Sequence, residues 1–231
     1  MVICGLQKLT LLDYPGLVAC TVFTRGCNYA CPYCQNSSLV ISNKFASAIP
    51  EKEVKDFLAS RVNKLDGVCI SGGEPSLQKD LEQFASYCKS LGFKVKLDTN
   101  GSSPSTIKKL VEAGLVDYIA MDIKNSLDKY PSTVNSVVDI NKVKESIDYL
   151  INQTKIDYEF RTTCIKEHHC EDDFEKISKM LKGAKVLYLQ NFILSDGVID
   201  KSLHGFSKEE LCKFQAIVRS HQIKCELRGI D

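Results

Sequence analysis

Segments with the apolar pattern of a β-strand alternate with segments that have the period of an α-helix along nearly all of this 231-residue chain. Consecutive strands that are joined by helices form a parallel sheet with right-handed crossovers. Six such strand–helix units are too few to close an eight-stranded barrel. The sequence therefore predicts an α/β fold, a curved and partial (β/α)6 barrel with one open side, in a single domain that covers residues 1–231.

The individual elements follow from the same patterns. The strands are expected at 17–24, 67–71, 93–98, 117–123, 157–163 and 185–191, with a short closing strand at 223–227. The helices are expected at 50–63, 77–91, 104–113, 141–152, 171–181 and 208–220. Residues 6–16 are expected to form an apolar segment with a turn. Because chemistry in such barrels gathers at the C-terminal ends of the strands, polar residues there are the candidates for a site.

Charge and hydropathy exclude several classes of function. Thirty Lys and Arg residues stand against 29 Asp and Glu residues, which leaves a net charge of +1. Such a balance provides no basic surface for nucleic acid or for an anionic membrane. No run reaches the roughly 18 apolar residues of a membrane span, and the N-terminus lacks the pattern of a secretion signal. We therefore expect a cytoplasmic protein that acts on small molecules or on other proteins.

Three cysteines with short spacing follow the first predicted strand. Cys27, Cys31 and Cys34 form a C-x3-C-x2-C pattern, and Tyr33 directly precedes the third cysteine. Three thiolates so close together can each hold one iron of a 4Fe–4S cluster, and since such clusters normally take four cysteines, the fourth iron is left open for chemistry. A structural zinc site is the alternative, but it usually draws on paired C-x2-C units, and the chain has no second unit.

The remaining eight of the 11 cysteines lie in apolar segments without the spacing of metal ligands. Without a secretion signal, the chain is expected to stay in a reducing compartment, where thiols persist. We therefore predict that these eight are buried and behave as small hydrophobic side chains. They are Cys4, Cys20, Cys69, Cys88, Cys164, Cys170, Cys212 and Cys225.

A glycine-rich run, formed by Gly72, Gly73 and Glu74, follows the second predicted strand. Two consecutive glycines let the backbone approach a ligand closely with its own N–H and C=O groups. Together with the three cysteines and the aromatic Tyr33, this run resembles the radical SAM superfamily. The resemblance implies a TIM-like partial barrel in which S-adenosylmethionine chelates the open iron, and in which Tyr33 and the glycine-rich run bind that cofactor.

Two acidic side chains lie at the ends of the third and fourth predicted strands. Asp98 ends one strand, and Asp122 shares a face with Lys124 on the next, because side chains alternate along a strand. At similar heights the carboxylates would repel each other unless a cation or the lysine compensates; solvated loop carboxylates are the alternative. Resemblance to glycyl-radical activases implies that Asp98, Thr99 and Asp122 hold a monovalent cation. It also implies that Lys124 pairs with the carboxylate of S-adenosylmethionine and that Asn100 belongs to the same cofactor site.

The fifth and sixth predicted strands end in further polar residues. Arg161 is expected to point into the barrel, where a buried arginine must pair with an anion, either a substrate carboxylate or Glu159. Gln190 ends the sixth strand, where the family often places a polar residue on the ribose. We assign both Arg161 and Gln190 to the cofactor-binding site.

The run His168-His169-Cys170 has side chains that can bind metal. Three acidic residues follow at 171–173, at the start of a predicted helix, where negative charge suits the helix dipole. A loop and a helix cap are therefore favoured over a second metal site.

Three sequence runs near the ends of the chain point to one family within the radical SAM superfamily. Residues 6–16, 21–27 and 227–231 are similar to the longer form of anaerobic ribonucleoside-triphosphate reductase activating protein. This implies a radical SAM oxidoreductase that reductively cleaves S-adenosylmethionine and abstracts a glycine Cα hydrogen on that partner enzyme. A flavodoxin- or ferredoxin-type protein is the implied electron donor. Gln35 stands where many relatives have histidine, so the role of an imidazole there is lost.

Other functions stay open. An activase of another glycyl-radical enzyme, or a radical SAM enzyme that acts on a small molecule or peptide, would carry the same motifs. A zinc-stabilised binding module would bind neither iron nor S-adenosylmethionine. Colour distinguishes the last from the others, because a cluster protein is brown and a zinc protein is colourless.

Overall fold

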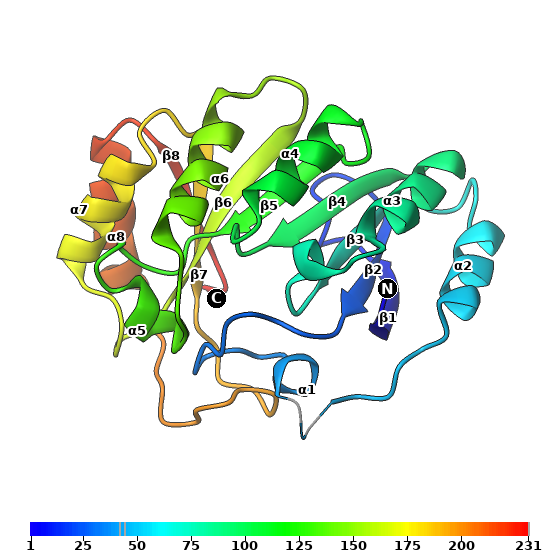
Figure 1. Cartoon of the computed structure of the whole chain (residues 1–231). Helices are drawn as coiled ribbons and strands as arrows, with labels where there is room; N and C mark the ends of the chain where they lie inside the picture. Colours follow the sequence, from blue (N-terminus) through cyan, green and yellow to red (C-terminus); the bar gives the residue numbers. More distant parts are fainter. Residues whose placement is uncertain (42, 44, 231) are drawn as a thin grey trace.

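The computed structural model describes residues 1–41, 43 and 45–230, and in them one eight-stranded sheet is formed. Its strands are β1 Ile3–Thr10, β2 Ala19–Thr24, β3 Gly67–Gly72, β4 Lys94–Thr99, β5 Tyr118–Asp122, β6 Asp157–Cys164, β7 Val186–Asn191 and β8 Lys224–Arg228. They lie side by side in sequence order (Figure 1). β1 is antiparallel to β2, and all later neighbours are parallel.

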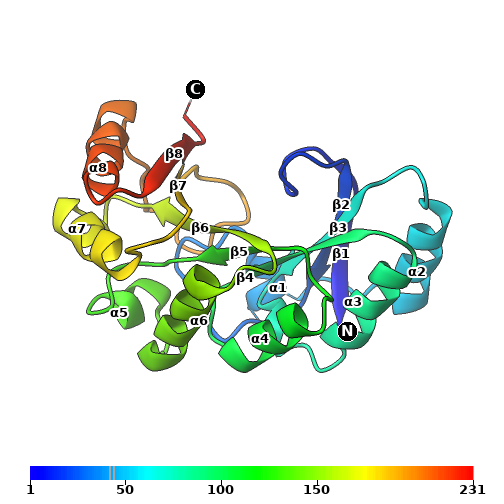
Figure 2. The same cartoon turned by 90° about the horizontal axis from the view of Figure 1, so that it is seen from above.

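The longer helices lie on the outer face of the curved sheet, and none of them lies on its inner face (Figure 2). Each of these helices connects one strand to the next parallel strand. They are α2 Glu51–Ser60, α3 Leu81–Ser90, α4 Pro104–Glu112, α6 Ile140–Asn152, α7 Glu171–Met180 and α8 Lys208–Ser220. Shorter helical turns are α1 Ser37–Val40, η2 Pro75–Leu77 and α5 Tyr130–Val134.

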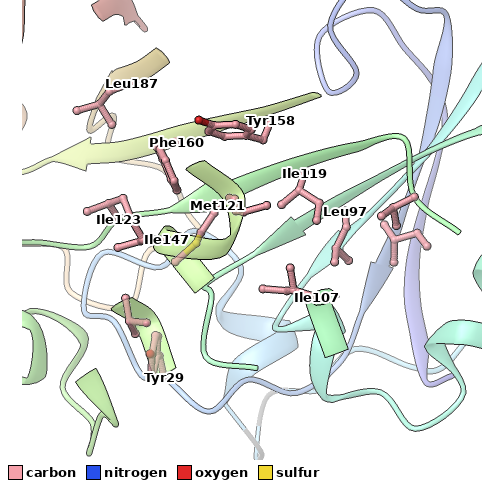
Figure 3. Packing of buried hydrophobic residues seen from close by; sticks show 14 of the residues in the cluster. Tyr29, Leu97, Ile107, Ile119, Met121, Ile123, Ile147, Tyr158, Phe160 and Leu187 are labelled. Atoms are coloured by element: carbon pink, nitrogen blue, oxygen red, sulfur yellow. The ribbon is translucent and has the colours of Figure 1, made fainter. Parts of the chain in front are cut away.

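The core lies between the sheet and the outer helices. Leu97 pairs with Ile119 across β4 and β5, and Met121 pairs with Phe160 across β5 and β6. These side chains are fully buried, and Leu97 lies near Ile107 of α4 (Figure 3). Burying each such side chain contributes about 2 kcal/mol. Because side chains alternate along a strand, the residues between them face the inside of the barrel, which leaves that face for polar groups.

The barrel is open, as predicted. Within the described residues no pairing joins β1 to β8, and these two strands form opposite edges of the curved sheet (Figure 2). The α/β fold with a partial barrel is therefore confirmed. In the same described ranges, no helix is long and apolar enough to span a bilayer.

The N-terminal strand departs from the sequence-based expectation. The apolar pattern predicts a segment with a turn at 6–16, whereas the structure has β1, which pairs with β2 from Ile3 to Thr10. Only its two end residues are buried, so the strand lacks the alternation that would reveal it. The short helices α1 and α5 are also absent from the prediction, because four or five residues are too few to show a helical period. Asp231, the last residue of the closing run, lies outside the described residues.

The prediction for the eight scattered cysteines is only partly right. Five of them are buried, whereas Cys4 is partly exposed and Cys170 and Cys212 are exposed. Cys170 precedes the first turn of α7, where it caps the helix. On α8 the buried residues include Leu211 and Phe214, so Cys212 falls on the solvent side of that helix.

Candidate active site

The three closely spaced cysteines lie in the loop between β2 and α1 and line one cavity of about 430 Å³. Cys31 is buried, Cys27 and Cys34 are partly exposed, and all three are free thiols. Burial raises the pKa of each thiol, and that of Cys27 reaches about 12. Because thiols bind metal as thiolates, a metal centre that binds here displaces their protons.

Backbone hydrogen bonds join the glycine-rich run at the end of β3 to the start of the cysteine loop. The N–H of Gly73 donates to the carbonyl of Thr24 at 2.8 Å, and the N–H of Glu74 donates to the carbonyl of Gly26 at 2.8 Å. A Cβ atom on Gly73 would overlap the carbonyl oxygen of Gly26, and Gly72 has a φ of +115°. Glycine is therefore needed at both positions to bring the two loops together.

Glu74 is buried and is fully engaged by neighbouring donors. Its carboxylate accepts hydrogen bonds from the N–H of Ser76 at 3.0 Å, from Oγ1 of Thr99 at 2.7 Å and from the N–H of Asn100 at 2.6 Å. Burial raises the pKa of Glu74, although these donors oppose the shift. Asn100 in turn donates from Nδ2 to Oδ1 of Asn28 at 2.9 Å. Glu74 and Asn100 therefore hold the end of β4 against the glycine-rich run and the cysteine loop.

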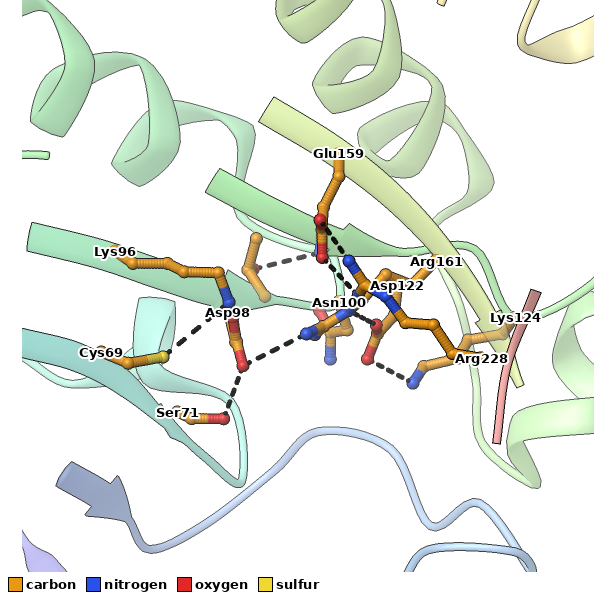
Figure 4. Close-up of polar contacts among 12 residues, drawn as sticks. Cys69, Ser71, Lys96, Asp98, Asn100, Asp122, Lys124, Glu159, Arg161 and Arg228 are labelled. Carbon is orange, nitrogen blue, oxygen red and sulfur yellow. Dashed lines mark hydrogen bonds and ion pairs between the residues drawn. The ribbon is translucent and has the colours of Figure 1, made fainter. Parts of the chain in front are cut away.

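Arg161 bridges the two acidic side chains of β4 and β5 (Figure 4). Its Nε donates to Asp122 at 2.9 Å and its Nη1 to Asp98 at 3.4 Å, while Nζ of Lys124 donates to Asp122 at 3.0 Å. Burial alone would raise the pKa of Asp122, but Arg161 and Lys124 hold it at about 2. The sequence predicts that Asp98 and Asp122 lie at similar heights in the sheet. In the structure Asp98 pairs with Ala120, so Asp122 lies two residues closer to the C-terminal end of β5 than the residue opposite Asp98.

Two further cationic groups inside the barrel come from positions that the sequence analysis did not select. Lys96, whose side chain is 1% exposed, forms an ion pair with Asp98. Arg228 donates to both carboxylate oxygens of Glu159 at 3.0 Å, so Glu159 is not the partner of Arg161. The alternation of side chains along β4 could have revealed Lys96. No local signal connects Arg228 with Glu159, because 69 residues separate them.

The loop between β7 and α8 packs over the cysteine loop. The N–H of Asp200 donates to the carbonyl of Pro32 at 2.8 Å, and Nε2 of Gln35 donates to the carbonyl of Ile193 at 3.0 Å. A Cβ atom on Gly197 would overlap the carbonyl oxygen of Gln35. Gln35 therefore connects the cysteine loop to the rim of the cavity, a role that nothing in the sequence indicated.

Comparison with known proteins decides the family. Residues 21–181, more than half of the chain, match the family model of the Radical SAM superfamily. The chain belongs to this superfamily. A 4Fe–4S cluster and S-adenosylmethionine are accordingly its cofactors.

Radical SAM relatives match this chain to different extents. A protein of Methanocaldococcus jannaschii that bears the name "Putative glycyl-radical enzyme activating enzyme" is 36% identical over 98% of this chain and 95% of its own length. A pyruvate formate-lyase-activating enzyme of Listeria monocytogenes is 31% identical over 52% of each chain. The match to the first protein therefore extends beyond the residues that the family model covers.

Solved structures of radical SAM enzymes share the fold. A radical SAM methyltransferase from Sphaerobacter thermophilus superposes with a TM-score of 0.72, covers 95% of this chain and 68% of its own, and is 16% identical. SuiB of Streptococcus suis, bound to S-adenosylmethionine, has a TM-score of 0.69, covers 90% of this chain and 52% of its own, and is 14% identical. At such low identities the likeness shows the fold alone.

The residues of the cavity fit both radical SAM cofactors. Cys27, Cys31 and Cys34 supply the three thiolates that a 4Fe–4S cluster with one open iron needs. The hydroxyl oxygens of Tyr29 and Tyr33, in the same cavity wall, are buried without a hydrogen-bond partner among the described residues. Buried polar atoms in proteins are rarely left unpaired, so a bound molecule is expected to satisfy them. The cavity volume is also within the range of small-ligand sites.

Every residue that the sequence analysis assigned to the radical SAM site lines this one cavity, although its role toward the cofactors stays a prediction. Those residues are Cys27, Cys31, Tyr33, Cys34, Gly72, Gly73, Glu74, Asp98, Thr99, Asn100, Asp122, Lys124, Arg161 and Gln190.

The run at 168–170 forms a loop and a helix cap. Nε2 of the buried His169 lies 3.0 Å from the carbonyl oxygen of Lys124, and the N–H of Cys170 donates to Asp173 at 2.9 Å. Burial lowers the pKa of His169 to about 4, so this imidazole stays neutral. In the part of the chain that the structure describes, no three His, Cys, Asp or Glu side chains converge as ligands of a single metal ion.

Proposed function

We propose that this radical SAM enzyme activates a glycyl-radical enzyme, anaerobic ribonucleoside-triphosphate reductase, by abstracting the Cα hydrogen of one glycine. The activase role is supported by the match to the Methanocaldococcus jannaschii protein over 98% of the chain. The choice of reductase as the partner is supported by the runs at 6–16, 21–27 and 227–231, which are similar to the reductase activating protein.

Each group in the cavity then has a task. When bound, the reduced cluster supplies the electron that cleaves S-adenosylmethionine and so generates the radical that takes the hydrogen atom. Cys27, Cys31 and Cys34 hold the cluster. The backbone of Gly72 and Gly73 receives the amino group of S-adenosylmethionine, and Lys124 its carboxylate. Gln190 contacts the ribose, and Tyr33 and Asn100 complete the cofactor site.

The open side of the barrel admits the partner's glycine. Among the described residues none of the longer helices lies on the inner face of the sheet (Figure 2), and the cavity reaches the rim, where Ile193 is 57% exposed. A loop of another protein can therefore approach the cofactor site from that side. In the same proposal a flavodoxin- or ferredoxin-type protein supplies the electron, and the 231 residues act as one domain in the cytoplasm.

An assay for the glycyl radical tests this function. The reconstituted enzyme is mixed without oxygen with dithionite, S-adenosylmethionine and anaerobic ribonucleotide reductase from the same organism, and the glycyl-radical doublet is recorded by EPR. A doublet that depends on all components is the expected result. Release of 5′-deoxyadenosine without a doublet would contradict the choice of partner. It would favour another glycyl-radical enzyme or a peptide as the substrate. A peptide is the second choice because the relative named "PqqA peptide cyclase" is 31% identical over half of this chain.

Replacing Asp122 by Asn is expected to weaken S-adenosylmethionine binding about tenfold, the loss that follows when a charge-assisted hydrogen bond is removed. Asp122 holds both Lys124 and Arg161, and an amide cannot balance their charges. Iron content should stay unchanged, because Asp122 is not a cluster ligand. Equilibrium dialysis with S-adenosylmethionine measures the affinity. The control is Asp157→Asn, because Asp157 is exposed and lies at the first residue of β6, away from the C-terminal ends of the strands. Equal affinity in Asp122→Asn and wild type would contradict the proposed role.

A further inference from the structure

The groups predicted to hold a monovalent cation are already engaged by the protein. Asp98 accepts a hydrogen bond from Oγ of Ser71 at 3.0 Å and pairs with Lys96 and Arg161. The hydroxyl of Thr99 donates to Glu74. To reach Asp98, a bound cation would therefore have to displace Lys96, Arg161 or the hydroxyl of Ser71.

Asp122 is occupied in the same way, because it accepts from Arg161 at 2.9 Å and from Lys124 at 3.0 Å. Thr99 also accepts a hydrogen bond, from the N–H of Gly101 at 3.1 Å. All three predicted ligands are therefore satisfied without an added ion.

Lys96 lies inside the barrel beside Asp98. The two residues are two positions apart on β4, so both side chains point to the inner face. The Lys96 side chain is 1% exposed, and its Nζ also lies 3.9 Å from Sγ of Cys69 on β3 (Figure 4). A buried ammonium is costly unless it is paired with an anion, and Asp98 is the anion that the structure places next to it.

Each aspartate of the predicted cation site already has cationic partners in the chain. Two carboxylates, Asp98 and Asp122, face three cationic groups, those of Lys96, Arg161 and Lys124. Buried charges of like sign repel strongly, because the surroundings screen them poorly. A potassium or sodium ion between the carboxylates would add a fourth positive charge to this cluster. The residues present therefore do not fit the cation that the family resemblance implies.

We propose that the ammonium group of Lys96 takes the place of the monovalent cation beside Asp98, so that S-adenosylmethionine binding does not depend on potassium or sodium. This inference rests on the placement of S-adenosylmethionine in this cavity under the proposed function, and it holds for any partner enzyme. A cation-dependent relative is expected to lack a buried lysine at this position of the strand.

The affinity of the reconstituted holoenzyme for S-adenosylmethionine tests the proposal without any partner. Equilibrium dialysis is performed at constant ionic strength in potassium chloride, sodium chloride or choline chloride. The wild-type dissociation constant should change by less than about twofold among the three salts, since a factor of two is a small free-energy difference. A loss of about tenfold or more in choline chloride would overturn the proposal. The glycyl-radical assay reports on the partner separately, so failure of the two proposals can be told apart.

Replacing Lys96 by Met tests the role of the ammonium group directly. Methionine keeps an unbranched side chain of similar length but removes the charge, so Asp98 loses one of its two cationic partners. In choline chloride the variant should bind S-adenosylmethionine about tenfold more weakly than wild type, and potassium or sodium should restore the affinity. Lys94→Met on the same strand is the control, because Lys94 is 58% exposed and pairs with Asp117. Equal affinity of Lys96→Met in all salts would overturn the proposal. If Lys96→Met does not fold, the wild-type comparison still decides.

Discussion

Replacing Cys31 by Ala is expected to abolish both the complete cluster and the cleavage of S-adenosylmethionine. Cys31 is the buried member of the three cavity thiols, and its loss leaves two thiolates for a cluster that needs at least three. Loss of a group that merely orients a metal ligand already costs 10–100-fold in affinity or activity. We therefore expect activity to fall by more than about 100-fold, with iron content, the brown colour and release of 5′-deoxyadenosine as the measurements.

Cys88→Ala is the matched control for this prediction. Cys88 is also fully buried, but it lies on α3 and does not line the cavity. Its replacement should cost about 1 kcal/mol of stability, as expected for a small deletion in a packed core, and should leave the cluster intact. A Cys31→Ala protein that still released 5′-deoxyadenosine would show that Cys31 is not an essential ligand.

Replacing Gly73 by Ala is expected to separate the glycine-rich run from the cysteine loop. The added Cβ would overlap the carbonyl oxygen of Gly26, so the backbone hydrogen bonds to Thr24 and Gly26 cannot both persist. Overpacking against backbone, which cannot move aside as a side chain can, should lower the free energy of unfolding by about 3 kcal/mol. Because Gly73 also approaches the proposed site of the amino group, affinity for S-adenosylmethionine should fall with it.

Gly92→Ala distinguishes crowding from loss of glycine flexibility. Gly92 has a φ of +86°, and an added Cβ there would meet nothing within 4 Å. This control should cost about 1 kcal/mol of backbone strain and leave cofactor binding unchanged. Urea unfolding and equilibrium dialysis measure the two effects. If Gly73→Ala matched Gly92→Ala in both, close contact between the two loops would not be essential.

Periodicity predicted most of the fold because the outer helices and the parallel strands are buried on one or both faces. Leu97, Met121 and Phe160 are examples, since each is fully buried between sheet and helices. β1 escaped prediction because it lies at the edge of the sheet, where hydrogen bonds to β2 rather than apolar burial hold it. The exposure of Cys212 was not predicted because it depends on which face of α8 is buried. The exposure of Cys170 was not predicted because this residue caps α7 from outside the helix.

Many residues of the site were predictable from the order of the strands and helices along the chain. Parallel strands bring their C-terminal ends to one edge of the barrel, so Cys27, Gly73, Asp98 and Gln190 had to meet there once the alternation of strands and helices was recognised. The partners of the charged groups were not predictable in this way. Arg161 pairs with two aspartates and Glu159 with Arg228, because pairing depends on distances across several strands.

The sequence by itself determined the partial barrel, the cysteine loop and many of the polar residues that line the cavity, because hydrophobic period and motif spacing are local properties of the chain. Only the tertiary structure decided which charges neutralise one another, that Glu74 and Asn100 hold the loops together, and that Lys96 lies against Asp98. The reason is physical. Electrostatic pairing in a buried site depends on register, side-chain direction and exclusion of water, and these exist only after the strands have come together.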